Sequence, residues 1–207
     1  MTVNIQPPIH NQLEYFIEQA ACAPAIVTAV VHPVSHNGLV GAIEAANKGL
    51  ITPILIGPSA KIQAAADEEE LDISTYEIID VEHSHAAAEK ACELARQACV
   101  QTLMKGDLGS SELISAIINK QTGLRTERRL SHVFVFDVPN YHKPLIITDG
   151  AINVTPSLND KRDIIQNAID FSQYKLTKKL VAQMREYAAI LHPFPRDADF
   201  GEIPTEI

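Results

Sequence analysis

The 207-residue sequence has no tryptophan, only 5% aromatic residues and three cysteines, Cys22, Cys92 and Cys99. The cysteines form no CxxC pair and their number is odd, which predicts free thiols in a reducing compartment rather than a disulfide framework. No apolar run approaches the roughly 18 residues of a membrane-spanning helix, and residues 1–12 lack the charged and apolar regions of a signal peptide. The sequence therefore predicts a cytoplasmic protein with no membrane partner.

Basic residues are scarce in the first half of the chain. Residues 1–100 contain 4 basic and 13 acidic side chains, whereas residues 101–207 contain 13 of each. A nucleic-acid-binding protein has a large basic surplus on its surface, so the sequence predicts no nucleic-acid partner. A small anionic ligand held by a local basic cluster in the second half remains open.

The common signatures of metal and nucleotide sites are also missing. The sequence has no Rossmann glycine fingerprint, no nucleophile elbow and no zinc signature. The histidines of the first half lack thiol or carboxylate partners at metal-ligand spacing, so no metal site is predicted, and His83 and His85 are expected to be surface residues near a helix start.

Short β-rich apolar runs alternate with helical stretches along most of the chain. Strands are expected at 25–31, 51–56, 76–81, 99–104, 132–138 and 144–148. Helices are expected at 11–21, 36–48, 84–97, 110–119 and 160–171, with a further helix starting at 59. Strands separated by helices of 10–15 residues indicate βαβ crossovers. The sequence thus predicts an α/β fold with a mostly parallel sheet, helices on both faces, three layers, and a short antiparallel excursion at 132–148.

The loop after the expected strand at 99–104 is a candidate anion site. It carries Lys105, Gly106, Ser110 and Ser111 and opens a helix. Free backbone N–H groups at a helix start, the helix dipole and the lysine ammonium together suit an anion such as phosphate. The alternative is that Ser110 only caps the helix.

Three arginines, Arg125, Arg128 and Arg129, stand just before the strand expected at 132–138. Guanidinium groups suit phosphate or diphosphate oxygens, but the alternative is a solvated basic loop. Asp149 ends the strand expected at 144–148, where catalytic carboxylates are common, although Asp before Gly is also ordinary turn chemistry.

Taken together, residues 1–171 resemble the first part of the phosphate acetyltransferase and phosphate butyryltransferase family. The matching strings are LMKGD at 103–107, TGLRTERRLSHVFVFDVP at 122–139, PLIITDGAIN at 144–153 and DIIQNAIDF at 163–171. The resemblance implies two α/β domains with the active site between them. It also implies transfer of an acyl group from acyl-CoA to phosphate, with CoA as a substrate and no bound cofactor.

The resemblance also implies roles for the candidate residues. Lys105, Gly106, Ser110 and Ser111 would form the anion-facing loop, and Arg125, Arg128 and Arg129 would contact phosphate or CoA. Asp149 and Asn153 would orient those groups.

Residues 174–207 resemble a different family, a late segment of aspartate carbamoyltransferase. The matching strings are YKLTKKLV and AAILHPFPR. By resemblance, His192 and Arg196 would bind an anion. We therefore expect an incomplete phosphate acyltransferase-like region at 1–171 and a transcarbamylase-like tail at 172–207. A deliberate hybrid, a recombined or mis-assembled gene, and a truncated protein with an unrelated tail all remain open at this point.

The later part of the acyltransferase family, which supplies further catalytic residues, has no counterpart in this sequence, so impaired activity is expected. The alternative functions are a catalytically inactive phosphate- or CoA-binding module or a hybrid protein, and carbamoyl transfer ranks below both. A homo-oligomer is expected from the uncompleted cleft.

Overall fold

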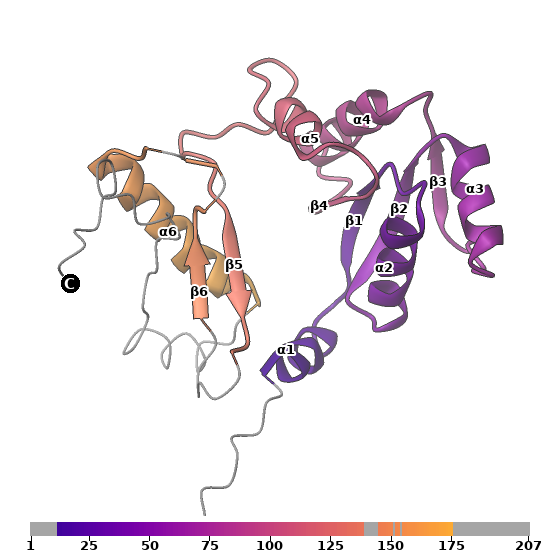
Figure 1. The fold of residues 1–207 in the computed structure, drawn as a ribbon, viewed down its shortest axis with the longest axis horizontal. Coiled ribbons are helices and arrows are strands. Elements are labelled where there is room, and N and C mark those ends of the chain that lie inside the picture. The colour runs from indigo at the N-terminus through magenta and orange to yellow at the C-terminus, as the bar shows by residue number, and fades with distance from the viewer. Residues whose placement is uncertain (1–11, 139–144, 151, 154, 176–207) are drawn as a thin grey trace, which may run out of the picture. The chain divides into compact units, whose positions relative to one another are not determined.

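The computed structural model describes residues 12–138, 145–150, 152, 153 and 155–175 (Figure 1). These residues fall into two compact units. Residues 17–126 form the first, here called the sheet unit. Residues from 127 onward, together with the described residues before 17, form the second, here called the hairpin unit.

The sheet unit is built on four parallel strands in the order β3-β2-β1-β4. The strands are β1 (Ile26–Val31), β2 (Ile51–Gly57), β3 (Glu77–Asp80) and β4 (Thr102–Lys105). The helices are α2 (His36–Asn47), α3 (Ser59–Glu68), α4 (Ser84–Arg96) and α5 (Ser110–Ile117), and α1 (Gln12–Ala21) precedes β1. The predicted α/β class and parallel sheet are confirmed.

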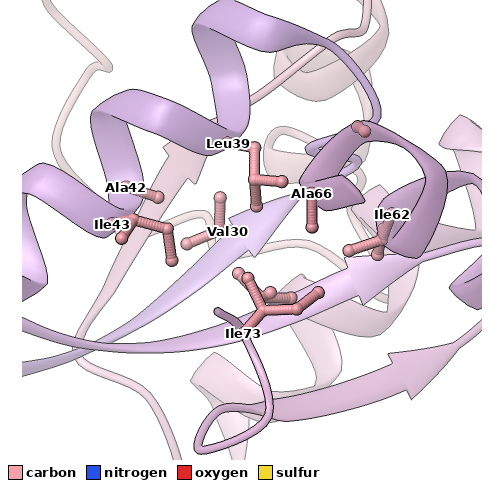
Figure 2. Packing of buried hydrophobic residues seen from close by; sticks show 9 residues of the cluster. Val30, Leu39, Ala42, Ile43, Ile62, Ala66 and Ile73 are labelled. Atoms are coloured by element: carbon pink, nitrogen blue, oxygen red, sulfur yellow. The ribbon is translucent and has the colours of Figure 1, made fainter. Parts of the chain in front are cut away.

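Both faces of this sheet are buried, which explains why β1 and β2 are nearly continuous apolar runs. Val30 and Leu55 face a cluster that includes Leu39 of α2 (Figure 2). Their neighbours Val31 and Ile56 belong to a second cluster, which contains the alanines of α4. Because successive strand residues point to opposite faces, the two clusters confirm the predicted three layers. Each fully buried aliphatic side chain contributes about 1.5–3 kcal/mol.

Three helices of the sheet unit end with a residue in the left-handed conformation. The residues are Gly49 after α2, Glu70 after α3 and Ala98 after α4, with φ of 71°, 52° and 57°. In each case the next amide bonds back into the last helical turn, as for Leu50 N to Ala45 O at 3.0 Å, which is a Schellman motif. The end of α2 at Gly49 was predictable from its glycine, whereas no glycine or asparagine marks the ends of α3 and α4 in the sequence. The turn at Ala98 also explains why β4 starts at residue 102 and not at 99.

The hairpin unit pairs β5 (Val133–Phe136) with β6 (Leu145–Thr148) in antiparallel register, and Val133 lies opposite Thr148. Helix α6 (Leu158–Lys175) packs on β6. The predicted antiparallel excursion is confirmed, and residues 139–144, which join the two strands, lie outside the described residues.

The predicted domain boundary between residues 171 and 172 falls inside α6. Whether a separate segment begins there stays a prediction, because residues 176–207 lie outside the described part. None of the described helices has the length and apolar character needed to cross a membrane.

Candidate functional site

The loop after β4 is tied by its backbone to the end of β1. Gly106 N donates to Val31 O at 2.9 Å, and Asp107 N donates to His32 O at 2.8 Å. The His32 side chain adds a contact of 2.6 Å between its Nδ1 and Asp107 O. His32 itself has a φ of 58°, a conformation that few non-glycine residues adopt. These contacts hold Lys105, which is exposed, at the carboxyl edge of the sheet.

Gly106 is required at its position because two backbone segments enclose it. A Cβ there would lie 2.6 Å from Val31 O and 2.7 Å from His32 O. On the side of α2, a Cβ on Gly38 would lie only 3.2 Å from Gly106 Cα. The loop at 105–109 is therefore closely packed against the end of β1, and its anion-facing role stays a prediction.

Helix α5 starts directly from this loop. Gly109 is its N-cap residue and Ser110 is the first helical residue, so the alternative in which Ser110 caps the helix is wrong. Ser110 and Ser111 are exposed, and within the described part of the chain no acceptor is recorded for their backbone N–H groups. Such groups at a helix start can donate to an anion.

A carboxylate that the sequence analysis did not select lies at the same helix start. The pKa of Glu112 is lowered mainly by a hydrogen bond from Ser84, with further contributions from the nearby His85 charge and the Gly109 N–H. Glu112 stands at the position that the glutamate of a capping box takes, three residues after the N-cap, although the N-cap Gly109 has no side chain to complete the motif. This spacing was the signal available in the sequence. The negative charge of Glu112 offsets part of the positive N-terminal dipole of α5.

The three predicted arginines are divided between the two units. Arg125 belongs to the sheet unit and is exposed, and no ion-pair partner for it is recorded among the described residues. Arg128 and Arg129 belong to the hairpin unit, and both are exposed.

Arg129 is held in the hairpin unit by two side chains. Its Nε lies 2.7 Å from Asp160 Oδ1 of α6, and its Nη1 donates to Asn153 Oδ1 at 3.2 Å. Asn167 of α6 also donates to Arg129 O at 2.8 Å. These contacts occupy only part of the five donor groups of a guanidinium, so an anion ligand remains compatible with them.

Asp149 and Asn153 are buried together beside this arginine, with exposed fractions of 2% and 7%. The Asn153 side-chain amide donates to Asp149 Oδ2 and also to Leu130 O at 3.0 Å. Asp149 has a φ of 62°, and its amide donates to His132 O at 2.8 Å. The structure thus brings Asp149, Asn153 and Arg129 into one network, as their predicted orienting role requires.

Asp160 links this network to the start of α6. Its Oδ2 accepts from Ser157 N at 2.9 Å and from Ser157 Oγ at 2.8 Å, which explains why α6 begins before the predicted residue 160. The hydrogen bonds from Ser157 lower the pKa of Asp160, with Arg129 adding to the effect. A depressed carboxyl pKa stabilises the folded state above the ordinary aspartate pKa of about 3.9, and this contribution is lost as pH falls through the folded value.

We therefore expect Asp160→Asn to lower the melting temperature of the hairpin unit at neutral pH, and the difference from the parent chain to vanish in acid. The measurement is thermal unfolding as a function of pH. The matched control is Asp163→Asn on the same helix, because Asp163 makes only a 3.4 Å ion pair with the exposed Arg162. A difference that persists unchanged in acid would contradict the assigned role of the Asp160 charge.

The remaining predicted residues, His192 and Arg196, lie outside the described residues, and the transcarbamylase-like tail stays a prediction. Within the ranges that the structure describes, no group of three or more His, Cys, Asp or Glu side chains is arranged to hold a metal ion.

The known proteins that are similar in sequence to this chain are phosphate acetyltransferases and phosphate butyryltransferases. A phosphate acetyltransferase of Rhizobium meliloti is 57% identical over 165 residues, which are 80% of this chain and 51% of that protein. A phosphate butyryltransferase of Clostridium beijerinckii is 36% identical over 126 residues, covering 61% of this chain and 42% of that protein. No protein-family model matches the chain. The chain spans about half the length of the curated relatives it matches.

A solved phosphotransacetylase from Streptococcus pyogenes has a similar fold. It aligns with a TM-score of 0.64 at 13% identity over 80% of this chain and 58% of that chain. At this identity the likeness shows the fold alone.

Proposed function

This chain is a homologue of the phosphate acetyltransferases and phosphate butyryltransferases, and we propose that it transfers an acyl group from acyl-CoA to inorganic phosphate. The products are an acyl phosphate and CoA. The 57% identity to a phosphate acetyltransferase over 80% of the chain carries this proposal. CoA takes part in this reaction as a substrate and not as a bound cofactor. The proposed location of the protein is the cytoplasm, and its assembly into a homo-oligomer stays a prediction.

The proposed reaction requires positively charged groups held in fixed positions, and it does not require a covalent intermediate with the enzyme. A phosphate oxygen attacks the thioester carbonyl carbon, a tetrahedral oxyanion forms, and the CoA thiolate leaves. Cations and N–H donors held in place orient the phosphate and stabilise the developing charge. In the sheet unit the proposed groups are the Lys105 ammonium and the backbone amides of Ser110 and Ser111.

In the hairpin unit, Arg129 is the proposed contact to phosphate or CoA. Its orientation is fixed by Asn153 and Asp160, so its guanidinium plane is set before an anion arrives. This reduces the ordering that binding requires. Asp149 accepts from the Asn153 side chain in turn, which supports the orienting role proposed for both residues. Arg125 and Arg128 are further candidate contacts.

The test is acyl phosphate formation from acetyl-CoA or butyryl-CoA and phosphate, followed by release of the CoA thiol. We expect Lys105→Ala to lower turnover by about 100-fold, the typical effect of removing one fixed donor to a developing charge. The matched control is Lys48→Ala, because Lys48 is an exposed lysine at the opposite end of α2 and should leave turnover unchanged.

The acyl-transfer proposal fails if a folded sample shows no turnover with either acyl-CoA. Phosphate binding without turnover would instead identify the chain as an anion-binding module. Calorimetric titration with phosphate of the parent chain and of Lys105→Ala separates these two outcomes.

A further inference from the structure

We infer that His85, oriented by Glu112, is the residue that moves the proton in the acyl transfer proposed above. The inference rests on that proposed function and adds a chemical step to it. His85 and Glu112 both belong to the sheet unit, where α4 and α5 each begin.

The two side chains form a short ionic contact in which only one partner is exposed. His85 Nδ1 lies 2.8 Å from Glu112 Oε1, and the side chains are 74% and 17% exposed, respectively. Glu112 Oε1 itself is buried and receives no aligned hydrogen bond from any described donor. A buried acceptor oxygen without a hydrogen-bond donor is uncommon. A small rotation of the exposed His85 imidazole would align its Nδ1–H with Glu112 Oε1 and supply the missing donor.

The contact determines which imidazole nitrogen is available for chemistry. Glu112 is ionised at neutral pH because an ordinary glutamate has a pKa of about 4.3, and the Ser84 hydrogen bond lowers the pKa of this carboxyl group further. An ionised carboxylate only accepts hydrogen bonds, so it favours a proton on Nδ1 of the facing imidazole. Nε2 of the neutral imidazole then carries the lone pair. A carboxylate that fixes the tautomer of an exposed histidine is the usual arrangement for a general base.

The pair lies beside the loop that is proposed to bind phosphate. Glu112 lies against Gly109 of that loop, where a Cβ on Gly109 would be 3.8 Å from Glu112 Cβ and 3.9 Å from its Oε2, and Ser110 and Ser111 precede Glu112 on α5. Titratable groups near the pair include His83, whose ring centroid lies 6.0 Å from that of His85, and His32. Glu89 also stands one helical turn after His85 on α4. His83 is committed to the helix end, since its Nδ1 accepts from Ala86 N at 3.1 Å.

The proposed step balances without any added reactant. Nε2 of His85 takes the proton of hydrogen phosphate as the phosphate oxygen forms its bond to the carbonyl carbon. The bond between that carbon and the CoA sulfur then breaks. The imidazolium returns the proton to the departing thiolate, so acyl phosphate, CoA thiol and neutral His85 result.

The structure contains a matched control pair in the same unit. His36 Nδ1 lies 2.6 Å from Glu69 Oε1, with side chains 60% and 26% exposed, and this pair joins the first residue of α2 to the residue after α3. It has the same chemistry and similar exposure, but it has no contact with the loop at 105–111 among the interactions of the described residues. Removing it tests for any general effect of losing an exposed histidine–glutamate pair.

The experiment compares the parent chain, His85→Ala, Glu112→Gln and His36→Ala in the acyl phosphate assay, with the pH profile of kcat and with added imidazole. We expect His85→Ala to lower kcat by about 100-fold with little change in the KM for phosphate, within the usual range for a lost acid–base residue. Imidazole in solution should restore part of the rate to His85→Ala alone. Glu112→Gln should shift the pH profile, and His36→Ala should match the parent chain.

Three results would overturn the assignment. An active parent with a His85→Ala variant of equal kcat removes the role of His85 and leaves the proposed function intact. A His85→Ala variant that loses rate, raises the KM for phosphate and gains nothing from imidazole shows a structural role. A folded parent chain without turnover removes the proposed function and this assignment together.

Discussion

Gly106→Ala is expected to lower the free energy of unfolding of the sheet unit by about 3 kcal/mol, at the upper end of the usual effect of overpacking. A Cβ at this position would lie 2.6 Å from Val31 O and 2.7 Å from His32 O. Neither oxygen can move away easily, because Val31 is paired in β1 with strands on both sides. The loop would have to leave the end of β1, which would break the hydrogen bonds from Gly106 N and Asp107 N.

Urea unfolding measures this change, and Gly41→Ala is the matched control. Gly41 lies inside α2, and its Cβ would meet only Met104 Cε at 3.7 Å, an ordinary contact. Alanine in a helix interior is more favourable than glycine by about 0.5–1 kcal/mol, so this variant should be more stable than the parent chain. Equal stability of Gly106→Ala and the parent chain would show that the loop does not pack against β1.

Asn153→Ala is expected to destabilise the hairpin unit by about 3 kcal/mol, because it leaves buried polar groups without partners. The Asp149 carboxylate, 2% exposed, loses its side-chain donor, and Leu130 O loses a hydrogen bond of 3.0 Å. Arg129 Nη1 loses its acceptor in the same change. Hydrogen exchange of the β5 and β6 amides, together with urea unfolding, measures the loss within this unit.

The control for this prediction is Asn159→Ala on the exposed surface of α6. Surface substitutions of this kind usually change stability by no more than about 0.5 kcal/mol. If the two asparagine variants unfold alike, the buried network does not stabilise the hairpin unit.

The sheet unit was largely predictable because its strands are buried on both faces. The apolar runs around Val30 and Leu55 can be recognised as buried strands without knowing which strands they pair with. A continuous apolar run bounded by turn residues is itself the signal. The helix ends at Glu70 and Ala98 were not predictable, because neither residue type favours the left-handed conformation in which the local hydrogen bonds from Leu71 N and Cys99 N close these helices. The division of the chain after residue 126 was also missed, since no composition shift marks it.

The candidate site was predictable as a set of loops but not as a set of contacts. Lys105 and Asp149 were selected because each stands at the carboxyl end of an expected strand, and Arg129 because it is one of three clustered arginines just before a strand. The partners of Arg129 come from α6 and from the segment after β6, and no local pattern specifies which of its polar residues face the arginine. His85 was expected to be a surface residue, and its side chain is exposed. Its contact with Glu112 could not be predicted, because it depends on how α4 packs against α5.

The position of β1 in the sheet also constrains how the chain is made on the ribosome. β1 pairs with β2 on one side and with β4 on the other, yet β4 is synthesised only after two more strands and three helices. Until Lys105 has left the ribosome, one edge of an apolar strand has no partner, and open edges of this kind promote aggregation. A pause in translation within that interval would therefore expose the nascent chain to misassembly, and a chaperone that covers the edge of β1 would protect it.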